Sequence, residues 1–423
     1  MIEKLRGVRD FYPEDYYGRT VIHERLFGAL RRFGFREVCT PSIESLELFS
    51  RKAGDSIVDE IYAFKDKGGR DICLIPELTP SVARMVIQRQ KELKKPVKWC
   101  SLSRHWRYER PQKGRQREFY QYNVDIFGVR SSRADFEIIA AGIACLTAVG
   151  LENFLFHISN RRLLESFFSS YGVDAAQGFA VVDKRGKVPE DEFGAMLAGI
   201  GVDEGCAAAL EELLSVSGTI SEGIPRVEAL LDREDPHVAE ALLSLREMGE
   251  MLDAYGYGGH CMLDLSIVRG LAYYTDLVFE VFDKAKSMRS LFGGGRYDTL
   301  VELYGGQPMP AVGFAIGMPV LEILMKEEGS WPEPDFGPDY YIVTVGEVGE
   351  TAFKLIQSLR GRASVEYDLS GRNMKKQMNQ ANDIGAKRVV ILGERDLAEG
   401  RATVKDMVSG EQKVLAIADL FTL

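Results

Sequence analysis

Apolar residues in the first 150 positions recur with two different spacings. Between residues 17 and 33 they fall on one stripe of a predicted amphipathic helix: Val21, Ile22, Leu26, Phe27 and Leu30. Shorter segments rich in aromatic and β-branched residues predict strands at 35–40, 60–64, 71–75, 97–103 and 119–127. Helices are predicted near 80–92 and 132–149. Hairpin-connected strands with helices between some of them indicate an antiparallel sheet in an α+β domain.

The pattern changes twice further along the chain. Residues 160–258 are dominated by alanine, leucine and glutamate, which predicts a mostly helical segment. Strand-like and glycine-rich sequence resumes at Leu263, so the helical segment is expected to be an insertion within one sheet domain. Three prolines in residues 331–338 indicate a linker. Beyond it, strands and helices alternate, which predicts a small α/β domain with a largely parallel sheet.

These changes predict four segments: 1–159 and 259–330 as the two parts of the sheet domain, 160–258 as the helical insertion, and 338–423 as the C-terminal domain. The 423 residues are enough for domains with cores of their own. Hydrophobic residues make up 45% of the chain and charged residues 27%, which is typical of a soluble globular protein.

Charge and cysteine content exclude several classes of protein. The formal net charge of −10 argues against a protein that coats nucleic acid without specificity. The six cysteines are widely spaced, with no Cys-x-x-Cys pair, so we expect reduced thiols and no protein metal site. No apolar segment approaches the length of a membrane span, and the N-terminus has no signal-peptide pattern. A cytoplasmic protein without a membrane partner is therefore expected.

Residues 104–125 differ from this acidic background. They contain five arginines together with Lys113, between two predicted strands, and Pro111 and Gly114 mark the loop that joins them. A cationic loop between two strands is suited to binding a polyanion. The alternative is a solvated basic hairpin, which is what most charge runs are. The interleaved Trp106 and Phe119 favour the first interpretation.

Two longer motifs carry a resemblance to a known family. Residues 106–115, with sequence WRYERPQKGR, and residues 269–275, with sequence RGLAYYT, resemble signatures of the class II aminoacyl-tRNA synthetases, and within them of the histidyl-tRNA synthetases. The similarity extends from residue 6 to the C-terminus. It implies a class II antiparallel sheet domain with a helical insertion, followed by an α/β anticodon-binding domain. Residues 34–41 resemble motif 1, through which class II enzymes form homodimers.

The resemblance implies a histidine–tRNA ligase that uses ATP, histidine and tRNA(His). Histidine would attack the α-phosphate of ATP, giving histidyl-adenylate, and the acyl group would pass to the 3′ end of tRNA. Because two anions must meet, the site needs fixed positive charge and alignment. Mg²⁺ would accompany ATP without a dedicated protein metal site.

The nucleotide residues implied by the resemblance lie mostly in the basic hairpin. Arg107 would bind the α-phosphate and act in catalysis, since a forked guanidinium suits phosphate oxygens. Glu109 would accept a hydrogen bond from the adenine amino group, and Arg115 would meet the outer phosphates. Phe119 would stack on adenine, although core packing is an alternative role for this ring. The hairpin tip, Gln112 and Lys113, would contact tRNA.

The histidine residues implied by the resemblance come from three segments. Arg269, in the second signature, would contact both the α-phosphate and the substrate carboxylate and is the second catalytic residue. Glu77 and Thr79 would bind the α-amino group, with support from Gln121. Asp125 would accept a hydrogen bond from the imidazole. Tyr273 and Tyr274 would complete the histidine pocket.

One position departs from the class pattern. After residues 311–317 the class has Glu-Arg, with the arginine on the γ-phosphate in motif 3, whereas Pro319 and Val320 stand here. The missing charge would have to come from elsewhere, and Arg296, Arg115 and Arg117 are the sequence candidates.

This departure keeps a second function open, the histidine-sensing regulatory subunit of ATP phosphoribosyltransferase, which has a synthetase-like fold but does not activate histidine. The C-terminal domain and the retained arginines favour the ligase. A general RNA-binding protein is disfavoured by the acidity of the chain.

Overall fold

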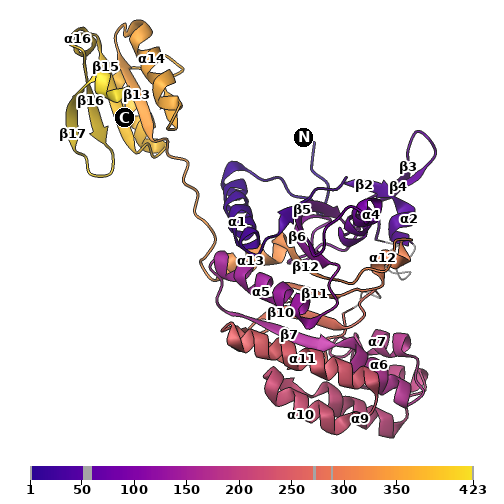
Figure 1. Ribbon diagram of the computed structural model, residues 1–423. Helices are drawn as coiled ribbons and strands as arrows, with labels where there is room; N and C mark the ends of the chain where they lie inside the picture. Colours follow the sequence, from indigo (N-terminus) through magenta and orange to yellow (C-terminus); the bar gives the residue numbers. More distant parts are fainter. Residues whose placement is uncertain (1, 51–59, 270–272, 287–288, 422–423) are drawn as a thin grey trace. The chain divides into compact units, whose positions relative to one another are not determined.

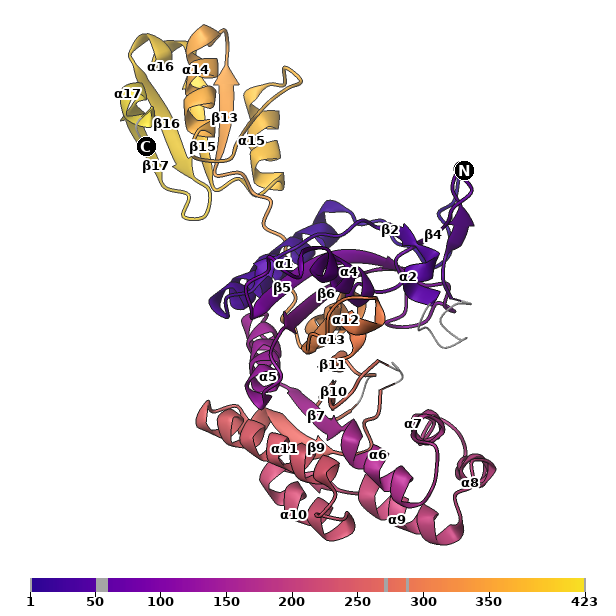
Figure 2. The same cartoon turned by 45° about the vertical axis from the view of Figure 1, so that its right-hand side comes forward.

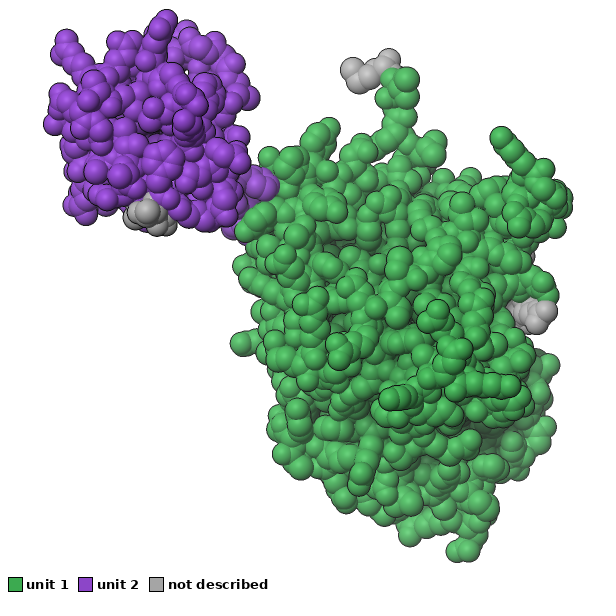
Figure 3. Space-filling view, turned by 45° about the horizontal axis from the view of Figure 1, so that its top comes forward, with its two compact units in different colours: residues 1–332 green, residues 333–423 purple. Residues whose placement is uncertain are grey.

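The computed structural model describes residues 2–50, 60–269, 273–286 and 289–421. Contacts divide the chain into two compact units, Met1–Pro332 and Glu333–Leu423, which Figure 3 colours separately. We describe each unit by itself.

The first unit is built on one large sheet (Figure 1). Among the described residues it contains nine strands, in the order β1 (Arg36–Glu37), β5 (Val97–Trp106), β6 (Glu118–Phe127), β12 (Ala311–Gly317), β11 (Phe292–Arg296), β10 (Leu277–Asp283), β7 (Phe154–Asn160), β9 (Cys261–Asp264) and β8 (Ser217–Gly218). The neighbours from β5 to β7 pair antiparallel, whereas β1 pairs with β5 and β9 pairs with β7 in parallel. The middle strands of this order come from segments almost 200 residues apart in the chain.

Alternation along β6 gives the sheet two different faces. Tyr122, Val124 and Ile126 point into a core formed with helices α1 (Pro13–Arg32) and α5 (Ser132–Ala148). Pro13 suits the first turn of α1, because its missing N–H would have no partner there. The intervening residues of β6 are polar and lie on the opposite face. One face therefore supports the sheet, and the other is available for ligands.

A second, smaller sheet lies beside the ligand face. Its strands are β2 (Ile43–Ser45), β4 (Asp71–Leu74) and β3 (Ala63–Lys65), and the helices α2 (Leu46–Ser50), α4 (Thr79–Arg89) and α12 (Leu300–Leu303) share its apolar core. The turn of the β3–β4 hairpin is held by Asp66, which accepts hydrogen bonds from the backbone N–H groups of Gly68 and Arg70. Helix α13 (Met318–Glu327) follows β12 directly.

The helical insertion follows β7 and returns to the sheet at β9. It contains α6 (Arg161–Ser170), α7 (Ala175–Val182), α8 (Glu190–Gly199), α9 (Glu204–Leu214), α10 (Ile220–Leu230), α11 (Pro236–Ala254) and the 3₁₀ helix η1 (Gly258–His260). Figures 1 and 2 show these helices gathered at one end of the large sheet. Aspartate, asparagine or threonine caps several of them, and Thr219 forms a complete capping box with Glu222.

The second unit is a three-layer α/β structure. Its sheet has the order β14 (Val365–Tyr367), β13 (Tyr340–Val345), β15 (Arg388–Gly393), β16 (Arg401–Asp406) and β17 (Gln412–Ala416). Helices α14 (Gly349–Arg360) and α15 (Met374–Asp383) belong to separate clusters on opposite sheet faces, and the short helices α16 (Glu394–Ala398) and α17 (Ile417–Leu420) complete the unit. Successive residues of β13 alternate between the two faces, as buried strands require.

The predicted α+β class with an inserted helical segment is confirmed, and so is a C-terminal domain with its own sheet. The prediction of a largely parallel C-terminal sheet is only partly right. β13, β14 and β15 are parallel, whereas β16 and β17 run antiparallel and were not predicted.

Candidate active site

A cavity of about 450 Å³ lies on the ligand face of the large sheet, a volume within the usual range for small-molecule sites. Its floor shows a regular pattern across the strands. Three polar residues of β6, Gln121, Asn123 and Asp125, pair with Gly317, Ala315 and Gly313 of β12. The small residues leave open space beside a row of hydrogen-bonding groups.

Glycine is required at two places in this floor because functional side chains cross the backbone there. A Cβ built at Gly293 of β11 would lie 2.7 Å from Cζ of Arg269. A Cβ at Gly313 would lie 2.5 Å from Oδ1 of Asp125 and 2.6 Å from the hydroxyl of Tyr297. The glycine-rich sequence of β11 and β12 is therefore a packing requirement of the site.

One end of the cavity carries positive charge from the basic hairpin. Arg107 donates from Nε to the Pro76 carbonyl at 2.9 Å, which fixes its orientation. Glu109 lies between two arginines, with Arg107 Nη1 at 3.8 Å and Arg115 Nη1 at 3.4 Å from its carboxylate. Both distances exceed that of a strong charged hydrogen bond, so these guanidinium groups retain capacity for a further anion.

Phe119 also lines this end of the cavity, beside the guanidinium of Arg107, whose Cζ is 5.5 Å from the ring centroid. His105 stacks on Phe119 with a centroid distance of 5.7 Å. Burial, with the nearby Arg107, lowers the pKa of His105 to about 3, so this imidazole is neutral. The Phe119 ring thus both lines the cavity and packs against His105.

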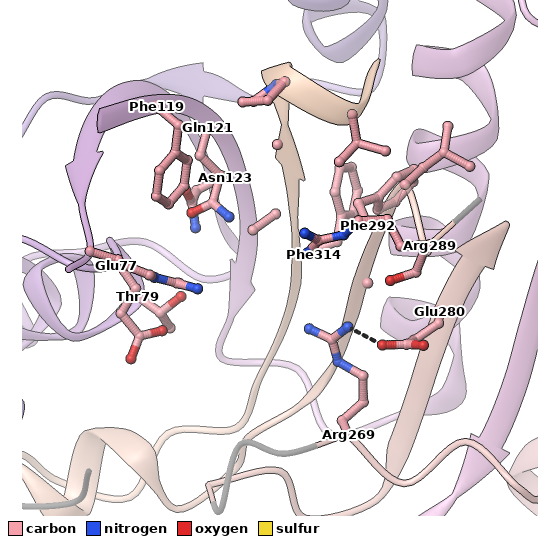
Figure 4. Close-up of a pocket in the computed structure, with 18 of the residues that line it drawn as sticks. Glu77, Thr79, Phe119, Gln121, Asn123, Arg269, Glu280, Arg289, Phe292 and Phe314 are labelled. Carbon is pink, nitrogen blue, oxygen red and sulfur yellow. Dashed lines mark hydrogen bonds and ion pairs between the residues drawn. The ribbon is translucent and has the colours of Figure 1, made fainter. Parts of the chain in front are cut away.

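Arg269 lies across the cavity from Phe119 (Figure 4). Its Nη1 donates to Glu280 at 2.7 Å, and its buried Nε has no hydrogen-bond partner among the described residues. Burial opposes its charge, but Tyr274 and Glu280 raise its pKa, so the side chain remains cationic. The backbone of Arg269 is left-handed, with φ of 55°. That conformation costs about 1 kcal/mol or more for a residue with a Cβ, and such strain clusters at functional sites.

The other end of the cavity is buried and holds two carboxylates. Tyr273 donates to Glu77 at 3.1 Å, and burial raises the pKa of Glu77. Tyr297 donates a short hydrogen bond to Asp125. Burial raises the pKa of Asp125 to about 7, while the Tyr297 hydrogen bond lowers it. The proton affinity of Asp125 is therefore much higher than that of a solvent-exposed aspartate.

The structure brings most of the sequence-predicted side chains to this one cavity. Of the residues that the motifs predict, the lining includes Glu77, Thr79, Arg107, Glu109, Arg115, Phe119, Gln121, Asp125, Arg269, Tyr273 and Tyr274. Residues 270–272, in the middle of the second signature, lie outside the described residues.

Arg296 is a correction to the sequence prediction. It is 1% exposed and does not line the cavity. Its guanidinium pairs with Asp135 at 2.7 Å and Asp298 at 3.1 Å, and it donates to the Val129 carbonyl at 3.0 Å. A guanidinium committed to these partners cannot bind a triphosphate, and Arg296 is a structural residue. Arg117 also lies outside the cavity lining and donates to the Glu109 carbonyl.

The hairpin tip lies outside the cavity as well. Gln112 and Arg115 exchange two backbone hydrogen bonds that close the tip. Lys113 is exposed and pairs with Glu327 of α13 at 2.8 Å. Both tip side chains are accessible to a large partner.

Several lining residues were not predicted from the sequence, and three of them bear on the chemistry of the site. Asn123 lies between Gln121 and Asp125 at the two-residue spacing of a strand, and that spacing was a usable signal. Tyr297 follows Arg296 in a motif that was interpreted for its arginine alone. Arg289 precedes the glycine-rich strand and belongs to no motif, so no local pattern predicts its role.

Among the described residues, no group of three histidine, cysteine or acidic side chains is placed to hold a metal ion. Within the same residues, no helix is both long and apolar enough to span a bilayer.

The fold and the cavity together define the class of protein. The antiparallel sheet carries arginines at one end of a pocket and, at the other end, hydrogen-bonding groups that suit an amino acid. This arrangement is that of a class II aminoacyl-tRNA synthetase. A family model described as Histidyl-tRNA synthetase matches residues 7–321, and one described as Anticodon binding domain matches residues 339–423. The chain belongs to the histidyl-tRNA synthetase family.

Individual relatives agree along the whole chain. A protein of Halorubrum lacusprofundi named Histidine--tRNA ligase is 41% identical over 430 residues, covering 99% of this chain and 96% of its own. A protein of the same name from Pyrococcus furiosus is 39% identical over 425 residues, covering 99% and 98%. The crystal structure of histidyl-tRNA synthetase from Nostoc sp. PCC 7120 has the same fold, with a TM-score of 0.84, 23% identity and coverage of 100% and 98%.

Proposed function

We propose that this cavity is the active site at which the chain performs the reaction of its family. The chain is an ATP-dependent, histidine-specific aminoacyl-tRNA ligase. One observation carries the site assignment: a single cavity places cationic side chains at one end and two buried carboxylates at the other. ATP phosphates suit the first end, and the amino group and imidazole of histidine suit the second.

In the first step, a carboxylate oxygen of histidine forms a bond to the α-phosphorus of ATP while the bond to the bridging oxygen breaks and pyrophosphate leaves. Arg107 and Arg269 both line the cavity, and we assign both to the α-phosphate. Their charge offsets the repulsion between the two anions and stabilises the transition state. The partnerless Nε of Arg269 is a buried donor available to the substrate carboxylate. In the second step a ribose hydroxyl of tRNA attacks the acyl carbon and AMP leaves.

Selectivity for histidine follows from the buried end. Glu77 and Thr79 would bind the ammonium group, with Gln121 beside them, and Asp125 would accept a hydrogen bond from an imidazole N–H. Tyr273 and Tyr274 would flank the ring. A site built from buried polar groups rejects apolar amino acids, because they would leave those groups without partners.

The adenine would lie between Phe119 and the carboxylate of Glu109, and Arg115 would meet the outer phosphates. Mg²⁺ would enter with ATP, where it would offset phosphate charge. Glu280 is a lining carboxylate of the oxygen-donor type that Mg²⁺ prefers.

Three further parts of the proposal concern partners and location. tRNA(His) would contact the exposed tip at Gln112 and Lys113, as well as the C-terminal unit. A homodimer would form through residues 34–41, where Arg36 and Glu37 of β1 are exposed. The protein would act in the cytoplasm.

Exchange of labelled pyrophosphate into ATP tests the proposal. We expect exchange that depends on histidine, and charging of tRNA(His) when tRNA is added. A regulatory subunit would bind histidine without catalysing exchange. Relatives that match the chain over nearly its full length disfavour that alternative. Absence of exchange at every magnesium concentration would refute the active-site assignment.

A further inference from the structure

The motif 3 position of this chain contributes no charge to the cavity. Pro319 and Val320 both line it, at the start of α13, where the class pattern has Glu-Arg. Val320 is apolar and 6% exposed. The outer phosphates of ATP therefore need a cation from another element.

Arg289 lies beside this position, although it is 31 residues away in sequence. A Cβ built at Gly114, in the hairpin tip, would lie 3.2 Å from Cγ2 of Val320 and 3.5 Å from Cδ of Arg289. The side chains of Arg289 and Val320 thus meet at the same point above the hairpin. Arg289 also lines the cavity, on the wall that carries Glu280 and Arg269 (Figure 4).

The guanidinium of Arg289 is not committed to a structural role. It is exposed, and its hydrogen bond from Nη1 to the Gly114 carbonyl is 3.5 Å long, beyond the usual range. No carboxylate among the described residues forms an ion pair with it. Arg107, Arg115 and Arg269 each have such a partner. In contrast, the guanidinium of Arg296 forms ion pairs with Asp135 and Asp298.

Arg289 lies close to the hairpin that carries the other cations. Its Nη1 is 3.5 Å from the carbonyl of Gly114, the residue before Arg115. Burial lowers the pKa of Arg289, and the charges of Arg115 and Arg107 lower it further, whereas Glu109 and Glu280 raise it. Cations gathered at one end of a cavity repel one another, and binding of a polyanion between them relieves that repulsion.

We propose that Arg289 binds the outer phosphates of ATP and replaces the arginine that class II synthetases carry in motif 3. The proposal rests on the active-site assignment above and deepens it. Arg107 remains at the α-phosphate, while Arg289 and Arg115 hold the β- and γ-phosphates. The pyrophosphate is thereby supported as it leaves, by a residue on the segment before β11 in place of one on α13.

The test compares ligands that differ only in the outer phosphates. In an Arg289→Ala variant, we expect the affinity for ATP to fall about 10- to 100-fold, as expected for loss of a charged hydrogen bond. The affinity for AMP, measured by isothermal titration, should stay within about twofold, because AMP lacks the phosphates concerned. The KM for histidine in pyrophosphate exchange should not change. Arg289→Lys keeps the charge and should recover part of the ATP affinity.

The control is Arg89→Ala, which removes an exposed arginine at the end of α4 that does not line the cavity. It should leave both nucleotide affinities unchanged. Unchanged ATP binding in Arg289→Ala, or equal losses for ATP and AMP, would overturn the proposal. Failure of the wild-type chain to catalyse exchange would instead count against the active-site assignment, so the two failures are distinguishable.

Discussion

The two ends of the cavity differ in burial and in how their polar groups are satisfied. At the histidine end, Asp125 and Tyr297 are 3% and 2% exposed, and the Tyr297 hydroxyl donates a hydrogen bond to Asp125. At the phosphate end, the side chains of Arg107 and Arg115 are 35% and 45% exposed and form only long ion pairs. A buried network fixes the direction of its hydrogen bonds and so selects one substrate. Exposed guanidinium groups, in contrast, attract any polyphosphate, and several contacts together must align it.

Arg269 joins the two ends. It is held by Glu280, and the left-handed backbone aims its side chain across the strand where Gly293 leaves room. It is the one described cationic side chain of the cavity that carries a buried donor without a partner. Arg269 therefore takes part both in the selection of histidine and in the activation of its carboxylate.

Arg269→Ala should have the largest effect on catalysis. We expect kcat/KM for histidine-dependent pyrophosphate exchange to fall about 100- to 1000-fold, comparable to loss of an oxyanion-hole donor. The loss should appear in kcat more than in the KM for ATP, because the residue acts on charge that develops in the transition state. Normal exchange in a folded Arg269→Ala protein would contradict the central position given to this residue.

Arg115→Ala should have a smaller effect, of a kind specific to the exposed end. We expect the KM for ATP to rise about tenfold, with the KM for histidine unchanged. Because the side chain is exposed, the difference between variant and wild type should shrink as salt rises from 50 to about 500 mM. A salt-independent difference would mean that this end is less accessible to water than the exposed fractions indicate.

How far the sequence predicts the site depends on whether each residue belongs to a pattern. The strand spacing of Gln121 and Asp125 places both on one face, and the structure has them there. The two arginine motifs likewise lead to the cavity. Arg296 shows the limit of such predictions. Its motif indicates proximity to the site, but only the packed structure shows that Arg296 forms ion pairs with Asp135 and Asp298.

The fold shows the same limit. The sequence predicts α5 within one residue at each end, because a long run of apolar residues is buried on nearly all sides of this helix. β16 is mostly half-buried and β17 is an exposed edge strand, and neither has much apolar alternation, so they carry a weak signal. Arg289 had no local signal because its environment is made by the hairpin tip and α13, which are distant in sequence.

Tyr297→Phe should have the smallest effect and tests the buried end. The Tyr297 hydroxyl stabilises the ionised form of Asp125, whose pKa burial has already raised to about 7. The carboxylate accepts a hydrogen bond from an imidazole N–H more strongly than the protonated acid does, so kcat/KM for histidine should fall as pH drops through this pKa. Removing the hydroxyl raises the pKa further, and the acid limb of the profile should move to higher pH by about one unit.

Free histidine titrates in the same range, but it titrates identically with both enzymes, so the difference between the two profiles reports on the protein. The pH dependence of the KM for ATP serves as the internal control, because the phosphate end is outside the Asp125–Tyr297 pair. Tyr273→Phe is the matched variant: it removes a hydroxyl from Glu77 instead. An acid limb that moves equally in both tyrosine variants would mean that Asp125 does not set it, and that the two buried carboxylates titrate as one coupled group.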